Sequence, residues 1–228
     1  MEIEYLTEYK ETNSVDEHWL YLKDELISLI DYRLKTSNNR WYQEQYMYDR
    51  LYIDEFHPSY PSDINRLPKG IVAEGVFWEA CKLTNRKCFP CLGQEDAFGT
   101  DFRITYDKET RFFDVTVNTS ERGFRKKIRE ERFPTLFLPW KENESNNGYK
   151  RSYAERYLKT GSINTEEYFS NLIYSNYKIL DKLKRSFWRK EKSEDSVFGR
   201  KTFDFDRVGI QYIRNLEGVL RLLRECSN

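Results

Sequence analysis

Apolar residues recur at helical spacing through the first third of the chain. A capping box at Ser14 and Glu17 is followed by apolar positions three or four residues apart, which predicts an amphipathic helix ending near Ser37. These positions are Trp19, Leu20, Leu22, Leu26, Ile27, Leu29, Ile30 and Leu34. An aromatic-rich segment at residues 41–56 is a candidate second helix, and a loop with two prolines at residues 57–63 closes it.

The aromatic side chains of this second segment admit two interpretations. They could stack on nucleic-acid bases, or they could belong to the hydrophobic core. Aromatic residues at helical spacing are more often core residues, so we expect burial. The residues concerned are Trp41, Tyr42, Tyr46, Tyr48 and Tyr52.

The central part of the chain changes its periodicity. Pro68 suits a helix start, and an apolar stripe follows over about three turns at Ile71, Val72, Val76, Phe77, Ala80 and Cys81. Residues 99–106 and 111–118 flank a polar turn and are rich in β-branched and aromatic residues, which predicts a β-hairpin. A helix at about residues 119–132 and a short strand at 135–138 come next.

The last third looks helical. It follows a polar linker at residues 141–148, and a capping box at Asn164 and Glu167 opens a helix to about Lys192. A final helix carries an apolar stripe that either docks on the core or builds a homodimer: Val208, Tyr212, Leu216, Val219, Leu220 and Leu223. We therefore expect a helical extension (1–67), an α/β core (68–140) and a C-terminal helical region packing on it (141–228).

Composition narrows the class of protein. The 228 residues contain 38 Lys+Arg and 38 Asp+Glu, so bulk charge attraction to nucleic acid is not expected and any polyanion contact needs a local patch. Residues 121–132 and 178–192 are two such basic runs, although solvated helix faces would explain them equally well. No apolar run is long enough for a bilayer and the acidic start is no signal peptide, so we expect a cytoplasmic protein without membrane contact.

Three carboxylates are the candidate chemical centre. Asp114, Thr116 and Asn118 alternate with valines and share one strand face, while Asp101 starts the partner strand and Glu74 lies on the preceding helix. Carboxylates gathered in one cleft would repel each other by up to ~4 kcal/mol per close pair at an effective dielectric of ~20. A Mg²⁺ or Mn²⁺ ion would relieve this repulsion and could activate water against a phosphodiester.

The predicted elements follow one another as a helix with Glu, a strand with Asp, a strand with Asp-Val-Thr, a helix and a strand. This order resembles the core of the PD-(D/E)XK nuclease superfamily over about residues 68–140. The resemblance implies a restriction-endonuclease-like α/β fold with a central mixed sheet flanked by helices. It also implies that Glu74, Asp101 and Asp114 hold the metal, the two aspartates being 13 positions apart. Thr116 stands where the family normally has its catalytic lysine.

The missing lysine makes activity a separate question, since losing one transition-state donor typically lowers a rate ~10²–10³-fold. Lys126 or Lys127 could supply the charge, and Thr116 or Asn118 could position water. Phosphate contacts are expected from five further basic residues: Arg122, Arg125, Arg129, Lys184 and Arg185.

Two functions follow as hypotheses. The first is a Mg²⁺-dependent endonuclease acting on DNA. The alternative is a catalytically inactive nuclease-like scaffold that serves as a DNA-binding or protein-interaction module. Cys81, Cys88 and Cys91 have the spacing of half a zinc site, but a structural zinc site needs four ligands and reduced thiols are the simpler interpretation.

Overall fold

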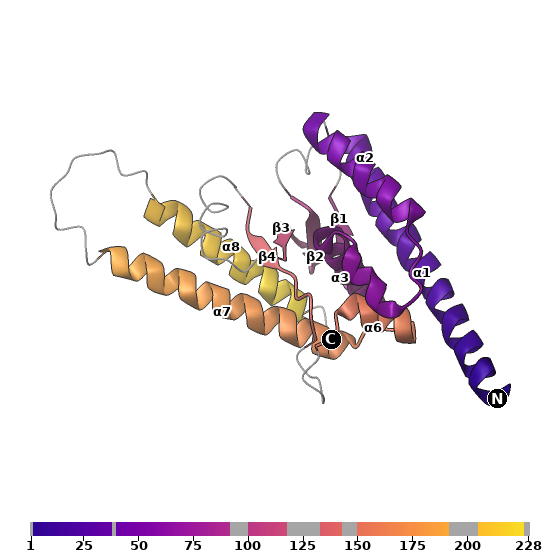
Figure 1. Ribbon diagram of the computed structural model, residues 1–228. Coiled ribbons are helices and arrows are strands. Elements are labelled where there is room, and N and C mark those ends of the chain that lie inside the picture. Colours follow the sequence, from indigo (N-terminus) through magenta and orange to yellow (C-terminus); the bar gives the residue numbers. More distant parts are fainter. Residues whose placement is uncertain are drawn as a thin grey trace.

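A four-stranded mixed sheet forms the centre of the protein in a computed structural model (Figure 1). The structure describes residues 2–37, 40–91, 100–117, 133–142, 150–191 and 205–225. The strands are β1 (Cys88–Pro90), β2 (Phe102–Tyr106), β3 (Glu109–Thr116) and β4 (Thr135–Phe137), in the spatial order β1-β2-β3-β4. The first three pair antiparallel, whereas β4 runs parallel to β3. An α/β fold with a mixed sheet is thus confirmed.

The predicted hairpin is confirmed with a tighter turn than expected. Strands β2 and β3 pair from Phe102 opposite Phe113 to Tyr106 opposite Glu109. Asp107 and Lys108 form the turn with φ of 42° and 67°. Two consecutive positive φ values twist the chain in the sense that a two-residue hairpin needs, and Asp tolerates this backbone conformation.

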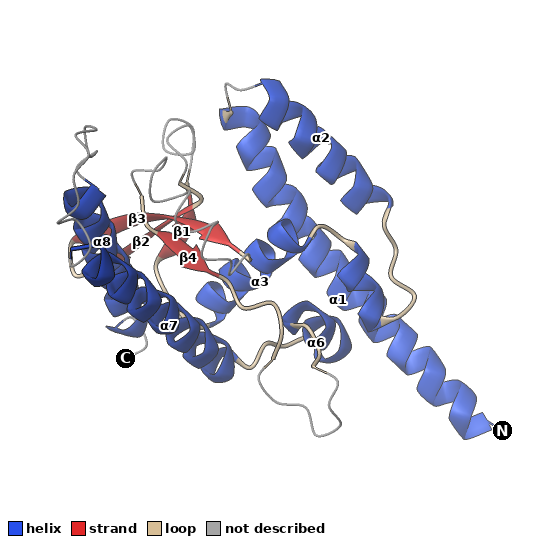
Figure 2. Ribbon diagram, turned by 60° about the vertical axis from the view of Figure 1, so that its left-hand side comes forward, coloured by secondary structure: helices blue, strands red, loops and turns tan. Residues whose placement is uncertain are grey.

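Helices α3 and α1 cover one side of the sheet (Figure 2). Helix α3 (Lys69–Leu83) starts after Pro68 as predicted, and its Phe77 ring packs edge-on against Phe102 and Phe113. Helix α1 (Glu2–Thr36) crosses α3 at Gly75, where a Cβ atom would lie 2.5 Å from Leu26. Helix α1 already begins at Glu2, so the prediction of a start at Ser14 was wrong. The residues before Ser14 are helical as well, so Ser14 lies within the helix and does not cap its start.

Helix α2 (Arg40–Glu55) packs against α1 and is followed by the 3₁₀ helix η1 (Pro61–Arg66). The prediction that its aromatic side chains are buried was wrong for four of the five. Trp41 is 65% exposed and Tyr48 69%, and Tyr42 and Tyr52 are also exposed, while Tyr46 is half-buried. The buried face of α2 is instead the one that carries Ile53.

Helices α7 (Thr165–Glu191) and α8 (Phe205–Glu225) lie on the other side of the sheet, and the short helix α6 (Tyr153–Thr160) packs near α1 (Figure 2). Asn164 caps α7 as predicted, since its Oδ1 accepts a hydrogen bond from the Glu167 N–H at 3.2 Å. The apolar stripe of α8 is buried in the core of this chain at Tyr212, Leu216, Val219, Leu220 and Leu223. Of the two alternatives for that stripe, docking on the core is the one observed.

The outer edge of β4 is closed by two side chains from these helices. The Thr135 N–H donates to the Tyr212 hydroxyl at 2.8 Å, and the Phe137 N–H donates to Asn176 Oδ1 at 2.9 Å. Asn176 Nδ2 also donates to the Phe137 carbonyl at 2.9 Å. An exposed strand edge would present unpaired backbone groups, so these contacts both fix β4 and block edge pairing.

Strand β1 lies in a stretch for which the sequence predicts no element, because three residues that include a proline carry no strand signal. The helix predicted at 119–132 and most of the 141–148 linker lie outside the described residues. In the part of the chain that is described, no helix is both long and apolar enough to cross a membrane.

Candidate functional site

The three predicted acidic residues come from three elements at one end of the sheet. Glu74 is buried on α3, Asp101 immediately precedes β2, and Asp114 is buried on β3. The Asp101 N–H donates to the Phe113 carbonyl at 3.1 Å, and Asp101 Oδ2 accepts from the Val115 N–H at 2.8 Å. These two bonds flank Asp114, so Asp101 is held next to it as the hairpin register predicts.

A buried arginine from α1 joins this end of the sheet. Nη2 of Arg33 forms ion pairs with Glu74 Oε2 and, at 3.1 Å, with Asp101 Oδ1. Burial alone would lower the pKa of Arg33, but the attraction of Glu74 and Asp101 outweighs it and the pKa lies above its ordinary value. Arg33 is therefore charged, and two carboxylates that are far apart in sequence share one cation.

Asp114 has a different set of contacts. Its Oδ2 accepts a hydrogen bond from the Thr135 hydroxyl at 3.3 Å, across the parallel pair of β3 and β4. Among the described residues, no three or more His, Cys, Asp and Glu side chains form a group that could hold a metal ion. Two of the predicted ligands thus meet at a cation, and the third lies beside them without completing a three-ligand group.

The donor set is nevertheless suited to a hard divalent cation. It offers only carboxylate oxygens, and Mg²⁺ is usually bound through one or two carboxylates while it keeps several waters. The Arg33 guanidinium already provides a positive charge that both Glu74 and Asp101 contact.

The remaining predicted residues divide into two groups. Thr116 is half-buried on β3, and its backbone carbonyl accepts from the Leu138 N–H at 2.8 Å. Lys184 pairs with Glu217 of α8 at 2.5 Å, which ties it to the helix pair, whereas Arg185 is exposed. Six predicted residues lie outside the described part of the chain: Asn118, Arg122, Arg125, Lys126, Lys127 and Arg129.

Cys81, Cys88 and Cys91, the three cysteines with the spacing of half a zinc site, are all buried. In the described part of the chain they do not form a metal-binding group with other ligands. Their burial is typical of structural cysteines that behave as small apolar residues.

Arg33 is the site residue that the sequence predictions missed. A signal was present, because Arg33 follows Leu26, Leu29 and Ile30 at helical spacing and so falls on the apolar stripe. A charged residue at a core position needs a buried partner of opposite charge. That rule indicates an acidic partner, but it does not say which one.

Comparisons of this chain with protein-family models, with curated proteins and with solved structures find no match.

Proposed function

We propose that this protein is a metal-dependent endonuclease that hydrolyses DNA phosphodiester bonds on a restriction-endonuclease-like core. The observation that carries the proposal is the cation shared by Glu74 and Asp101 next to Asp114. The order of α3, three antiparallel strands and a fourth strand parallel to β3 supports it. A cytoplasmic location belongs to the same proposal.

The residues of the site would have the following roles. Glu74 and Asp101 would hold the Mg²⁺ or Mn²⁺ ion, with Asp114 adding negative charge on the same side. When bound, the ion would supply an activated water and would polarise the phosphate. Thr116 can hydrogen-bond a water but carries no charge, and Arg33 is the cation in contact with the acids, so Arg33 would partly balance the negative charge of Glu74 and Asp101.

Cleavage of supercoiled plasmid DNA with Mg²⁺ or Mn²⁺ tests the proposal. The wild type should nick the plasmid, and Asp101→Asn and Asp114→Asn should each lower the rate about 10²–10³-fold, as loss of one electrostatic group in an active site typically does. Asp107→Asn is the matched control, because Asp107 is an exposed aspartate in the turn of the same hairpin. Nicking that persists in both active-site variants would refute the assignment.

A second candidate function is DNA binding without hydrolysis on the same scaffold. Two observations favour it: Thr116 replaces the expected lysine, and Arg33 already compensates two of the acids. The exposed aromatic face of α2 could then stack on bases. Calorimetric titration with Mn²⁺ separates the two candidates, because the endonuclease should bind the ion and lose it in Asp101→Asn. Binding of a DNA oligonucleotide without any Mn²⁺ affinity or nicking would support the second candidate.

A further inference from the structure

Helix α2 carries an exposed apolar face. Six of its large apolar side chains are exposed: Trp41, Tyr42, Met47, Tyr48, Leu51 and Tyr52. Among the side chains that the structure describes, no other helix or strand exposes more than two. Trp41, Tyr48 and Tyr52 are separated by two helical turns and then by one, so their rings share one side of the helix. Single exposed apolar residues are ordinary, whereas a continuous patch typically marks an interaction site.

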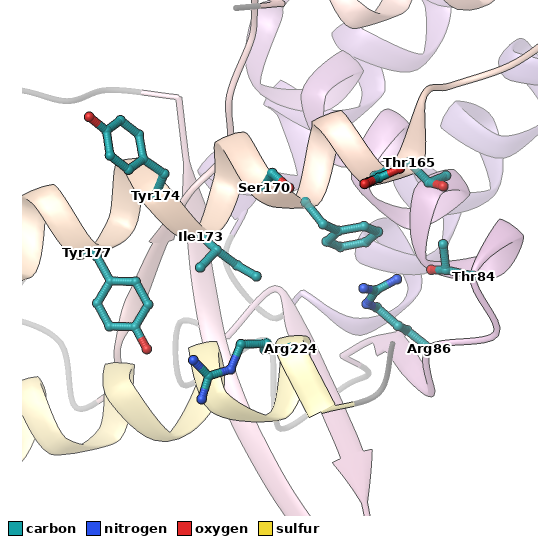
Figure 3. A pocket seen from close by; sticks show the side chains of 10 residues that line it. Thr84, Arg86, Thr165, Ser170, Ile173, Tyr174, Tyr177 and Arg224 are labelled. Atoms are coloured by element: carbon teal, nitrogen blue, oxygen red, sulfur yellow. The ribbon is translucent and has the colours of Figure 1, made fainter. Parts of the chain in front are cut away.

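The shape of this face does not suit a small molecule, because small-molecule sites are concave. The described chain has a concave site elsewhere, a cavity of about 850 Å³ between α7, α8 and the end of α3, with Arg86 and Arg224 in its wall (Figure 3). No residue of α2 lines that cavity. The exposed face is instead the outer side of a helix whose inner side packs on α1 (Figure 2). A macromolecule is therefore the better partner for it.

The charges of α2 favour a protein over a nucleic acid as this partner. Residues 40–55 contain four acidic and two basic side chains, and Arg50 is already paired with Asp31 at 2.6 Å. Glu44 and Glu55 lie one or two turns from Tyr48, on the same side of the helix as the aromatic rings. A polyanion would be repelled by these carboxylates. A protein surface with the complementary order of charges would be attracted.

A second copy of α2 in antiparallel orientation has this complementary order. Arg40 precedes Tyr48 by eight positions, and Glu55 follows it by seven. A two-fold axis near Tyr48 would therefore place Arg40 of one copy opposite Glu55 of the other, at both ends of the contact. The Arg40 side chain is 91% exposed, and Glu55 is exposed and forms no ion pair within the described residues. Glu44 and Tyr52 each lie four positions from Tyr48, so the Tyr52 hydroxyl of the second copy would face the Glu44 carboxylate as a donor.

The area of the face fits a weak dimer. Trp41, Tyr48 and Tyr52 are 65%, 69% and 48% exposed, so at ~150–250 Å² for each whole side chain they present roughly 270–460 Å² together. Two copies would bury about twice this area, and Leu51 and Met47 would add to it. The total approaches the ~1,200 Å² at which specific interfaces begin. We therefore expect a dimer that dissociates at micromolar concentrations.

We propose that two copies of this chain associate through the outer faces of α2, packed antiparallel about a two-fold axis near Tyr48. The apolar stripe of α8 takes no part, because it is buried within its own chain. The residues of this contact are not those of the candidate nuclease site, so the association does not depend on the proposed nuclease function.

Sedimentation velocity of the full chain at ~1–200 µM tests the proposal, with a monomer–dimer equilibrium as the expected result for the wild type. Arg40→Glu and Glu55→Arg should each weaken the dimer about tenfold or more, because each places like charges opposite each other at both ends of the contact. The double variant Arg40→Glu/Glu55→Arg should restore the dimer, since the two charges have exchanged places. A wild type that stays monomeric at 200 µM, or a double variant that is no better than the single variants, would overturn the proposal.

The aromatic contribution has a matched control. Tyr48→Ser/Tyr52→Ser should leave a monomer, whereas Tyr60→Ser/Tyr174→Ser, which removes two exposed tyrosines outside α2, should leave the dimer unchanged. Equal effects of the two variants would contradict the assignment of the face. A monomeric wild type that binds a single-stranded DNA oligonucleotide through Tyr48 and Tyr52 would assign the face to nucleic acid instead. Asp101→Asn should not change the dimer, so failure of the nuclease assignment and failure of this contact are distinguishable.

Discussion

The ion-pair cluster of Arg33 provides the sharpest test of how the N-terminal helices are joined to the core. In Arg33→Met the side chain keeps much of its length and apolar stem but loses its charge. Glu74 and Asp101 remain in this variant, and their side chains are only 11% and 18% exposed. They have lost the guanidinium that they share in the wild type. We expect a large loss of stability, because two largely buried carboxylates then lose the cation that they share.

The size of the effect follows from two opposing contributions. At 3.1 Å and an effective dielectric of ~20, the Arg33–Asp101 attraction is about 5 kcal/mol, and the closer Glu74 pair adds to it. Desolvation of the three groups offsets most of this gain in the native protein. Removing only the cation forfeits the attraction but leaves the carboxylates desolvated, which typically lowers the free energy of unfolding by about 3–5 kcal/mol. Total stabilities are only about 5–15 kcal/mol.

Urea unfolding followed by tryptophan fluorescence and circular dichroism measures this loss. The double variant Arg33→Met/Glu74→Gln should be more stable than the sum of the single effects predicts, with a coupling energy of about 1–3 kcal/mol. Millimolar Mn²⁺ should stabilise Arg33→Met more than the wild type, because the vacated carboxylate pair can then take up a cation.

Lys35→Met is the matched control, since Lys35 is an exposed basic residue of the same helix. It should change the free energy of unfolding by less than about 0.5 kcal/mol. A loss in Arg33→Met no larger than that of the control, or a coupling energy near zero, would refute the reasoning that the shared cation holds α1 to α3.

Two other predictions concern the sheet edge and the buried tyrosines. Asn176→Ala should lower the free energy of unfolding in urea by about 1–3 kcal/mol, because the Phe137 N–H and carbonyl both lose their partner. Asn215→Ala, on the surface of α8, is the control, and an equal loss of stability in this variant would contradict the prediction. Burial raises the pKa of Tyr153 to about 12 and that of Tyr168 well above 10. The folded protein therefore keeps protons that the unfolded chain releases, and its stability should fall above pH 10, by about 1.4 kcal/mol per pH unit for a fully buried tyrosine such as Tyr168. Tyrosinate absorbance of the folded protein should show Tyr153 ionising only near pH 12 and Tyr168 remaining protonated until the protein unfolds, and ionisation of either residue near pH 10 in a still folded protein would argue against the assigned burial.

Much of the secondary structure could be predicted because its signals are local. The α3 stripe, the hairpin around Asp107, the cap at Asn164 and the stripe of α8 each depend on residues a few positions apart. The placement of Asp101 beside Asp114 also followed from the hairpin, since antiparallel pairing fixes which residues lie opposite each other.

Features that depend on distant partners could not be predicted in this way. The sequence showed an aromatic segment at α2, but only packing against α1 decided that Ile53 faces inward and Trp41 and Tyr48 face outward. Strand β1 forms because β2 offers a free edge, and its three residues alone carry no such preference.

Local sequence patterns were sufficient to predict α3, the hairpin and α8, and to place three acidic residues in an α/β core. That Arg33 meets Glu74 and Asp101, and that Arg86 and Arg224 line one cavity, became clear only from the folded chain. Local backbone preferences and periodicity act over a few residues. Charge pairing acts through space, between groups that only the folded chain brings together.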